Sequence, residues 1–224
     1  MSVKHPQFIL AMDAAALAAY PHQYNAGFDP VHWAEQAQGH LVIRQRAQLE
    51  NEPAFRQILP YVVFVKDTPG QERRFAAYRR GKGVGESKLM GNASIGFGGH
   101  IDLGDVRQEN SVVLLGLTIA NAAEREIKEE VDFFGATGGI VQLPLTVSLE
   151  DAQALILDNS NEVGRVHMGL VIFKQLPEPV ATVGTRESEL ESLGLLTAQE
   201  LLNTGDPLEN WTRLILEHEA AVTA

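Results

Sequence analysis

The sequence lacks cysteine altogether, which excludes disulfide bonds and makes a cytoplasmic setting the natural expectation. It also lacks any apolar run near the roughly 18 residues of a membrane span. Basic residues are scarce, because 18 Lys and Arg face 29 Asp and Glu, for a net charge of −11. A nucleic-acid backbone is therefore not expected as the main partner, since proteins that bind it present basic patches. Small phosphorylated partners stay compatible, because a bound cation and a few arginines can set the local field.

The length and composition bound the number of domains. A chain of 224 residues with 45% hydrophobic content can bury the core of one large domain, or of one domain with an extension. We place an N-terminal extension, packed on the core, at residues 1–58 and the main domain at residues 59–224. The N-terminus is not typical of a signal peptide, because Asp13 interrupts its alanine-rich run.

The apolar pattern predicts a mixed α/β chain. Apolar, β-branched runs bounded by Gly, Pro and Asp predict strands at residues 61–66, 75–79, 95–97, 140–147 and 166–173. Alanine content and helical spacing predict helices at residues 14–19, 196–202 and 210–221. With a further helix around residue 125, this order suits a mixed sheet covered by helices.

That further helix carries the most informative stretch, Arg125 to Glu130, with the sequence REIKEE. Each helical residue advances by about 100°, so Glu126, Glu129 and Glu130 share one sector of the helix. A separate apolar stripe can pack on a core, at Ile119, Ala123, Ile127 and Val131. Like charges this close repel one another, and a hard divalent cation such as Mg²⁺ would remove the conflict. The alternative is a solvated acidic helix face, a common surface pattern.

A glycine-dense loop, Gly96 to Asp105, precedes this helix and follows an apolar run. Glycines let carbonyl oxygens approach a ligand closely. Loop and helix together resemble the Nudix box, so the chain is similar to MutT-like Nudix hydrolases and most similar to a branch of predicted Nudix phosphoesterases. The matching residues are Gly99, Asp105 in place of the first Glu, and Arg125, Glu126, Ile127, Glu129, Glu130 and Phe133.

Three departures from the family pattern stand out. Asp105 replaces Glu, a shorter side chain with the same charge. Nineteen residues separate Asp105 from Arg125 where the family has seven, so we place an insertion inside the box at residues 106–118. Placed earlier, it would put Leu117 at the acidic position, which makes no chemical sense. Finally, Asp132 replaces a Gly that often adopts a left-handed conformation at the helix end.

The resemblance implies a fold, a reaction and a set of ligands. It implies an α/β/α sandwich with a mixed sheet, and hydrolysis of a diphosphate linkage of the nucleoside diphosphate-X type in a small substrate, which could be a nucleotide. Mg²⁺, with Mn²⁺ as an alternative, would be held by Glu126, Glu129, Glu130 and a backbone carbonyl near Gly98. Arg125 would orient the glutamates through charge-assisted hydrogen bonds, or form an ordinary exposed ion pair.

Other residues are weaker candidates. Arg79 and Arg80 could clamp a phosphate, because guanidinium binds phosphate oxygens bidentately, or they could end a solvated hairpin. His100 could touch substrate or the metal's second shell, or cap the loop. His167 is expected to be a buried, hydrogen-bonded histidine. The family often adds a late carboxylate as ligand or base, here one of Glu187, Glu189 and Glu191.

Two questions stay open at this stage. The inserted stretch Ser111 to Leu117 is too apolar for a free loop, so it could extend the helix backward, form a short strand or build an interface, for example in a homodimer. The chain could also be a catalytically silent Nudix-like sensor of a nucleotide or sugar phosphate. A Nudix-fold isomerase is disfavoured, because that chemistry usually calls for a cysteine.

Overall fold

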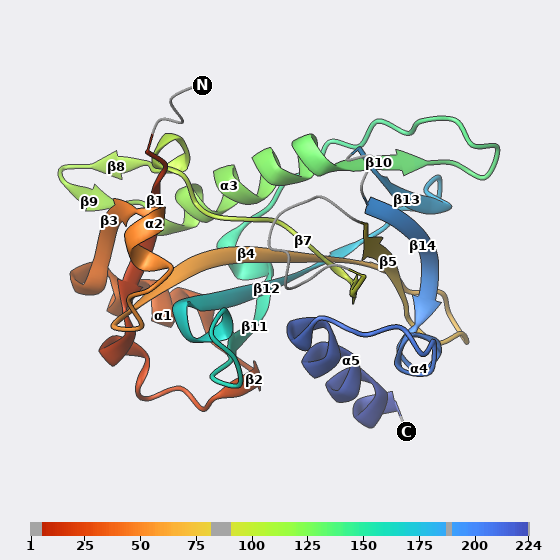
Figure 1. The fold of residues 1–224 in the computed structure, drawn as a ribbon. Coiled ribbons are helices and arrows are strands. Elements are labelled where there is room, and N and C mark those ends of the chain that lie inside the picture. The colour runs from red at the N-terminus through yellow and green to blue at the C-terminus, as the bar shows by residue number, and fades with distance from the viewer. Residues whose placement is uncertain (1–5, 82–90, 187–189, 224) are drawn as a thin grey trace, which may run out of the picture. The chain divides into compact units, whose positions relative to one another are not determined.

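A computed structural model describes residues 6–81, 91–186 and 190–223 (Figure 1). Contacts between Cα atoms divide the chain into two compact units. Unit 1 contains residues 1–61, 98–125 and 146–172, and unit 2 contains residues 62–97, 126–145 and 173–224. Three continuous elements have residues in both units: β4 (Phe55–Lys66), α3 (Leu115–Glu130) and β12 (His167–Gln175).

Unit 1 is built on antiparallel pairs. Strand β1 pairs with β3 on one side and with the start of β4 on the other, and β11 pairs with both β2 and β12. Ile9, Ala11 and Leu49 form a buried cluster. The other strands and helices of unit 1 are β1 (Phe8–Asp13), η1 (Ala14–Leu17), β2 (Gln23–Ala26), α1 (Pro30–Ala37), η2 (Gln38–His40), β3 (Leu41–Gln45), α2 (Arg46–Leu49), η4 (Leu103–Asp105), β8 (Gln108–Glu109), β9 (Val112–Val113), η5 (Leu149–Asp151), β11 (Ala152–Leu157) and η6 (Gly164–Val166).

Unit 2 surrounds strand β5, which pairs antiparallel with β4, β6 and β14. Figure 1 shows β5 beside β14, and α4 next to α5. Phe64 packs edge-on against Phe133, with ring centroids 5.2 Å apart, and also contacts Phe97. The remaining elements are β5 (Arg74–Arg80), β6 (Ala93–Ser94), β7 (Gly96–Phe97), β10 (Val131–Phe134), β13 (Thr182–Thr185), β14 (Leu190–Thr197), α4 (Ala198–Leu202) and α5 (Asn210–Thr223).

Helix α3 confirms the helix predicted around Arg125 and begins ten residues earlier than that motif, at Leu115. Its predicted stripe is buried at Ile119, Ala123 and Ile127, each at most 3% exposed. Four-residue spacing places these side chains on one face, and burying them stabilises the helix more than propensity does. The apolar end of the insertion thus extends this helix backward.

Several predicted elements differ from the structure. The strand predicted at residues 140–147 is wrong: apart from a single bridge between Phe134 and Ile140, the segment joins no ladder. Pro144 lies within it and has no N–H to donate, which explains why apolar spacing alone did not make a strand. The helix predicted at residues 14–19 is a 3-10 turn, and the one predicted at 196–202 begins at Ala198, where Thr197 caps it. Helix α5 confirms the prediction at 210–221.

Within the predicted extension, residues 8–13 form strand β1, which takes part in sheet pairing. The boundary predicted between residues 58 and 59 falls inside β4, whose residues 55–57 pair with β1. The division into an extension and a main domain therefore stays a prediction. Within the described ranges, no helix is both long enough and apolar enough to span a membrane. The mixed α/β class is confirmed.

Candidate functional site

The glycine loop is fixed to unit 1 at two points. Gly98 has φ of +141°, and a Cβ added there would lie 2.1 Å from the carbonyl oxygen of Pro60, so only glycine fits. Three residues further on, the backbone N–H of Leu10 donates to the carbonyl of Ile101 at 2.9 Å, and the Ile101 side chain is fully buried. His100 lies between these two anchors, so its backbone position is well determined.

Asp105 is held by the helix that follows it. Its carboxylate accepts two parallel hydrogen bonds from Arg125, Nε to Oδ1 at 3.0 Å and Nη2 to Oδ2 at 2.9 Å. The same carboxylate accepts the backbone N–H of Asp102 at 2.9 Å and closes a capping box. Asp105 is only 5% exposed. A buried carboxylate with bidentate guanidinium contact is a strong anchor, so Asp105 fixes the loop to α3.

Two more hydrogen bonds complete this connection. Arg125 Nη2 also donates to the carbonyl of His100 at 3.0 Å, and Asn121 Nδ2 donates to the carbonyl of Asp105 at 3.0 Å. The shorter Asp and the insertion therefore leave the contact between arginine and carboxylate intact. Orientation of the glutamates by Arg125 stays a prediction, since these bonds place it against the loop.

The three glutamates of α3 lie in unit 2 at the end of the helix. The helix is continuous to Glu130. Glu126 therefore lies about one turn before Glu129 and Glu130, at spacings of three and four residues. Glu129 is exposed, and the other two are partly exposed. Carboxylate oxygens in this arrangement suit a hard divalent cation. The predicted ligand set that adds the Gly98 carbonyl stays a prediction.

Arg186, which sequence reasoning missed, closes the end of α3. Its backbone N–H donates to the carbonyl of Glu130 at 2.8 Å, and its guanidinium donates to the carbonyl of Lys128 and to Asp132 Oδ1. Cations favour helix C-termini, where carbonyl groups lack partners. Asp132 itself lies in β10 and is not among the positive-φ residues of the described chain, so the absence of the family's glycine causes no strain here.

The predicted phosphate clamp is already engaged with carboxylates. Arg79 donates to Glu191 at 2.9 Å and to Asp206 at 2.6 Å, and Arg80 donates to Glu209 at 2.5 Å. Glu191 is the register partner of Arg79 on the neighbouring strand. An incoming phosphate would have to compete with these pairs. Substrate binding by either arginine stays a prediction, and Glu187 and Glu189 lie outside the described residues.

Two histidines face each other in unit 1. His100 Nε2 lies 3.2 Å from His167 Nε2, and His167 Nδ1 lies 2.7 Å from the carbonyl of Val163. His167 is 3% exposed, which confirms the expectation of a buried, hydrogen-bonded histidine. Burial, followed by the charge of Arg46 and by His167, lowers the pKa of His100 well below its ordinary value. His100 is therefore neutral at neutral pH.

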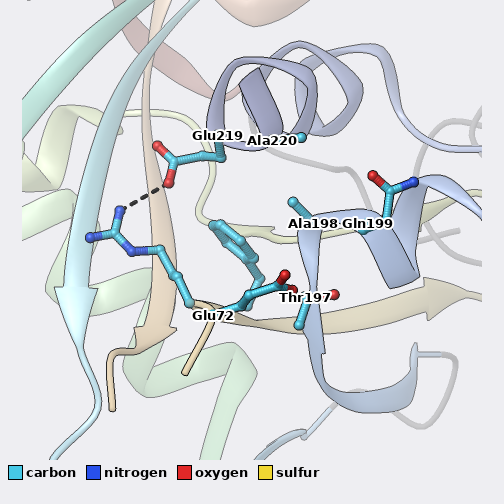
Figure 2. A pocket seen from close by; sticks show the side chains of 8 residues that line it. Glu72, Thr197, Ala198, Gln199, Glu219 and Ala220 are labelled. Carbon is cyan, nitrogen blue, oxygen red and sulfur yellow. Dashed lines mark hydrogen bonds and ion pairs between the residues drawn. The ribbon is translucent and has the colours of Figure 1, made fainter. Parts of the chain in front are cut away.

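A pocket of about 170 Å³ lies in unit 2, and none of the predicted site residues lines it (Figure 2). An ion pair between Arg73 and Glu219, 3.0 Å apart, forms one side, and Phe75 contributes apolar surface. Sites for drug-sized ligands usually measure about 300–1,000 Å³, so this pocket is too small for a nucleotide.

The glycine loop is tied by a carboxylate and an arginine to an acidic helix within an α/β fold, as expected from the resemblance to the Nudix box. No protein-family model matches the chain. It is 31% identical to Protein YmaB of Bacillus subtilis (strain 168) over 180 residues, which cover 77% of this chain and 75% of YmaB. The chain belongs to one family with YmaB.

Two solved structures align with the chain. The crystal structure of Tm1382, a proposed Nudix hydrolase, aligns with a TM-score of 0.68 at 20% identity, over 96% of this chain and 99% of Tm1382. A NUDIX hydrolase from Alicyclobacillus acidocaldarius aligns with a TM-score of 0.48 at 15% identity, over 74% of this chain and 91% of its own. The Tm1382 alignment shows that the chain has the Nudix-type α/β/α fold predicted from its sequence.

Proposed function

We propose that the protein is a Mg²⁺-dependent Nudix hydrolase that cleaves a diphosphate linkage of the nucleoside diphosphate-X type in a small phosphorylated substrate. The observation that carries this proposal is the bidentate pair of Arg125 with Asp105. It ties the end of the glycine loop to α3 across the insertion, and this connection supports the assignment of both segments to one Nudix box.

The chemistry of the donor set fits a hard cation. Glu126, Glu129 and Glu130 offer only oxygen ligands, and a cation among them would relieve their mutual repulsion. Mg²⁺ is the preferred ion, with Mn²⁺ as an alternative. When bound, such an ion neutralises phosphate oxygens and stabilises charge on the leaving phosphate.

The attacking water needs a carboxylate to orient or deprotonate it. Asp105 is a poor candidate, because Arg125 and the backbone N–H of Asp102 already occupy its oxygens. Glu191 is paired with Arg79. The base is therefore assigned to one of the α3 glutamates, with Glu187 and Glu189 as further candidates.

A catalytically silent sensor of a nucleotide or sugar phosphate is the alternative function. Three sequence features favoured it: Asp105, the insertion and Asp132. Asp105 keeps the contact with arginine, and Asp132 adopts no left-handed backbone, so two of these features no longer argue for lost activity.

The proposed hydrolase is further expected to assemble as a homodimer and to be located in the cytoplasm.

The substitution Glu129→Gln tests the proposal, because it keeps the side chain's shape and removes one negative charge. We expect kcat on an active diphosphate to fall by about 10²–10⁴, which corresponds to about 3–5 kcal/mol of transition-state stabilisation. The substrate comes from a panel of nucleoside triphosphates, ADP-ribose, dinucleotides and non-nucleotide diphosphates assayed with Mg²⁺ for released phosphate, with and without an added phosphatase. Glu217→Gln on the exposed face of α5 is the control and should leave kcat unchanged.

The outcomes separate the two functions. Equal turnover by the parent protein and Glu129→Gln would show that this carboxylate is not catalytic. A parent protein with no turnover on any diphosphate, yet stabilised by one of them in a thermal melt, would indicate the sensor.

A further inference from the structure

A second constellation of metal-ligand side chains lies in unit 1, apart from the glutamates of α3. Glu50, His100 and His167 each offer one ligand atom, and these three atoms all lie within 4.8 Å of one another. Glu50 caps the C-terminus of α2, His100 follows the glycines of the loop, and His167 opens β12. Three separate elements therefore converge on one point.

The imidazole pair already has the spacing of two metal ligands. Zinc–nitrogen bonds of about 2.0–2.1 Å in a tetrahedral site place two ligand atoms about 3.3 Å apart. His100 Nε2 and His167 Nε2 are 3.2 Å apart. The Glu50 oxygen lies within 4.8 Å of both nitrogens, and rotation about its side-chain bonds can adjust this distance.

The outer contacts of His167 prepare it for this role. Its Nδ1 lies 2.7 Å from the Val163 carbonyl, which can only accept a hydrogen bond, so Nδ1 carries the proton and Nε2 presents its lone pair toward His100. Metal-bound histidines usually donate their other N–H to a carbonyl or carboxylate in this way. Neutral imidazole is the form that binds metal.

Glu50 has a comparable outer contact. Arg46 Nε donates to Glu50 Oε1 at 2.9 Å, one helical turn away, which leaves Oε2 for a further partner. Glu50 and His100 are both partly exposed, so water can reach the position between the three side chains. The arginine also repels a cation, which sets an upper limit to the affinity.

We propose that Glu50, His100 and His167 form a binding site for a divalent transition-metal ion of the Zn²⁺ class, with water as a further ligand. This inference goes beyond the proposed hydrolysis, which uses Mg²⁺ on α3. Imidazole ligands favour Zn²⁺ and its neighbours, whereas carboxylates alone suit Mg²⁺. A bound ion would link α2, the glycine loop and β12, and would thereby stabilise unit 1.

Metal binding by the full-length protein tests the proposal directly. The protein is stripped with a chelator, dialysed against limiting Zn²⁺ in excess Mg²⁺, and analysed for metal content by mass spectrometry. We expect one Zn²⁺ per chain that excess Mg²⁺ does not displace, and a higher melting temperature with Zn²⁺ than without it. Co²⁺ should bind in its place and give the visible absorption of a low-coordinate site.

Substitutions locate the ion. Loss of an outer contact at a metal site costs about 10–100-fold in affinity, so loss of a ligand in Glu50→Gln should weaken Zn²⁺ binding by at least about tenfold, and His100→Gln should weaken it further. Glu52→Gln and His40→Gln are the matched controls, because Glu52 forms a similar exposed pair with Arg44 and His40 is exposed. Both partly exposed positions tolerate substitution better than the buried His167.

Three results would overturn the proposal. These are the absence of stoichiometric Zn²⁺ from the parent protein, equal Zn²⁺ affinity in the parent protein and in both site variants, and loss of Zn²⁺ on Glu126→Gln or Glu129→Gln instead. Because every readout is metal binding, none of these results depends on whether the protein hydrolyses a diphosphate.

Discussion

At Gly98 the backbone dictates the residue type. Its φ of +141° lies outside the range that L side chains adopt readily, and the Pro60 carbonyl oxygen fills the space where a Cβ would stand. Because the strain and the clash both arise in the backbone, no change of side-chain rotamer can relieve them. The loop that carries His100 and leads to Asp105 therefore depends on this glycine for its path.

Gly98→Ala should destabilise the protein by more than about 2 kcal/mol, because it adds both backbone strain and a clash. That loss corresponds to a fall of at least about 4 °C in melting temperature for a chain of this size. Gly104→Ala is the control in the same loop, since a Cβ there meets nothing within 4 Å. If Gly98→Ala and Gly104→Ala gave the same melting curve, the loop would be able to take another path.

At the scale of elements, the insertion becomes two regular pieces. Its first part is a short hairpin of β8 and β9, with Gln108 opposite Val113, and its last part is the first turn of α3. Asn110 and Ser111 both have positive φ, 49° and 67°, as a two-residue hairpin turn of type I′ requires. Two of the three alternatives for this segment, a strand and a helix extension, are therefore both realised.

Ser111→Gly should raise the free energy of unfolding by about 0.5–1 kcal/mol, because Asn-Gly suits this turn and a left-handed serine costs about 1–2 kcal/mol. Ala136→Gly is the control with the opposite sign. Ala136 is exposed and is not among the positive-φ residues. Glycine there gives the unfolded chain more freedom, which should lower the free energy of unfolding by a similar amount. Urea denaturation measures both changes, and a loss of stability in Ser111→Gly would contradict the turn assignment.

At the scale of the whole molecule, the proposed homodimer draws on exposed apolar side chains of the inserted region and its edge. Leu103 is 55% exposed, Val112 50% and Leu117 57%, all within unit 1. Exposed apolar groups that gather in one segment favour burial against a partner. Symmetric dimers are the commonest soluble assembly.

Sedimentation at micromolar concentration should therefore give the parent protein twice the chain mass of 24.5 kDa. Leu117→Lys should shift it to the monomer mass, because burying an unpaired charge in an interface is costly. Val222→Lys, at a residue 71% exposed near the C-terminus, should leave the dimer intact. A parent protein that sediments only as a monomer would end this proposal, and a dimer unaffected by Leu117→Lys would place the interface elsewhere.

The features that the sequence determined are local ones. Four-residue spacing of apolar side chains fixed the buried face of α3, and it needs no knowledge of what packs there. The Nudix box likewise lies within one stretch of chain, so Arg125, Asp105 and the glycine loop could be identified together. The apolar, β-branched run at residues 140–147 gave a wrong strand prediction, because strand formation requires a partner ladder that the composition of one segment cannot specify.

Only the tertiary structure decided which distant side chains meet. Strand pairing set Glu191 against Arg79, so this predicted phosphate-binding arginine forms an ion pair in the structure. Convergence of α2, the glycine loop and β12 brought Glu50 to His100 and His167, a group with no signature in the sequence. Such contacts depend on strand register and loop closure, which are global properties of the folded chain, whereas periodicity reports only on the element in which it occurs.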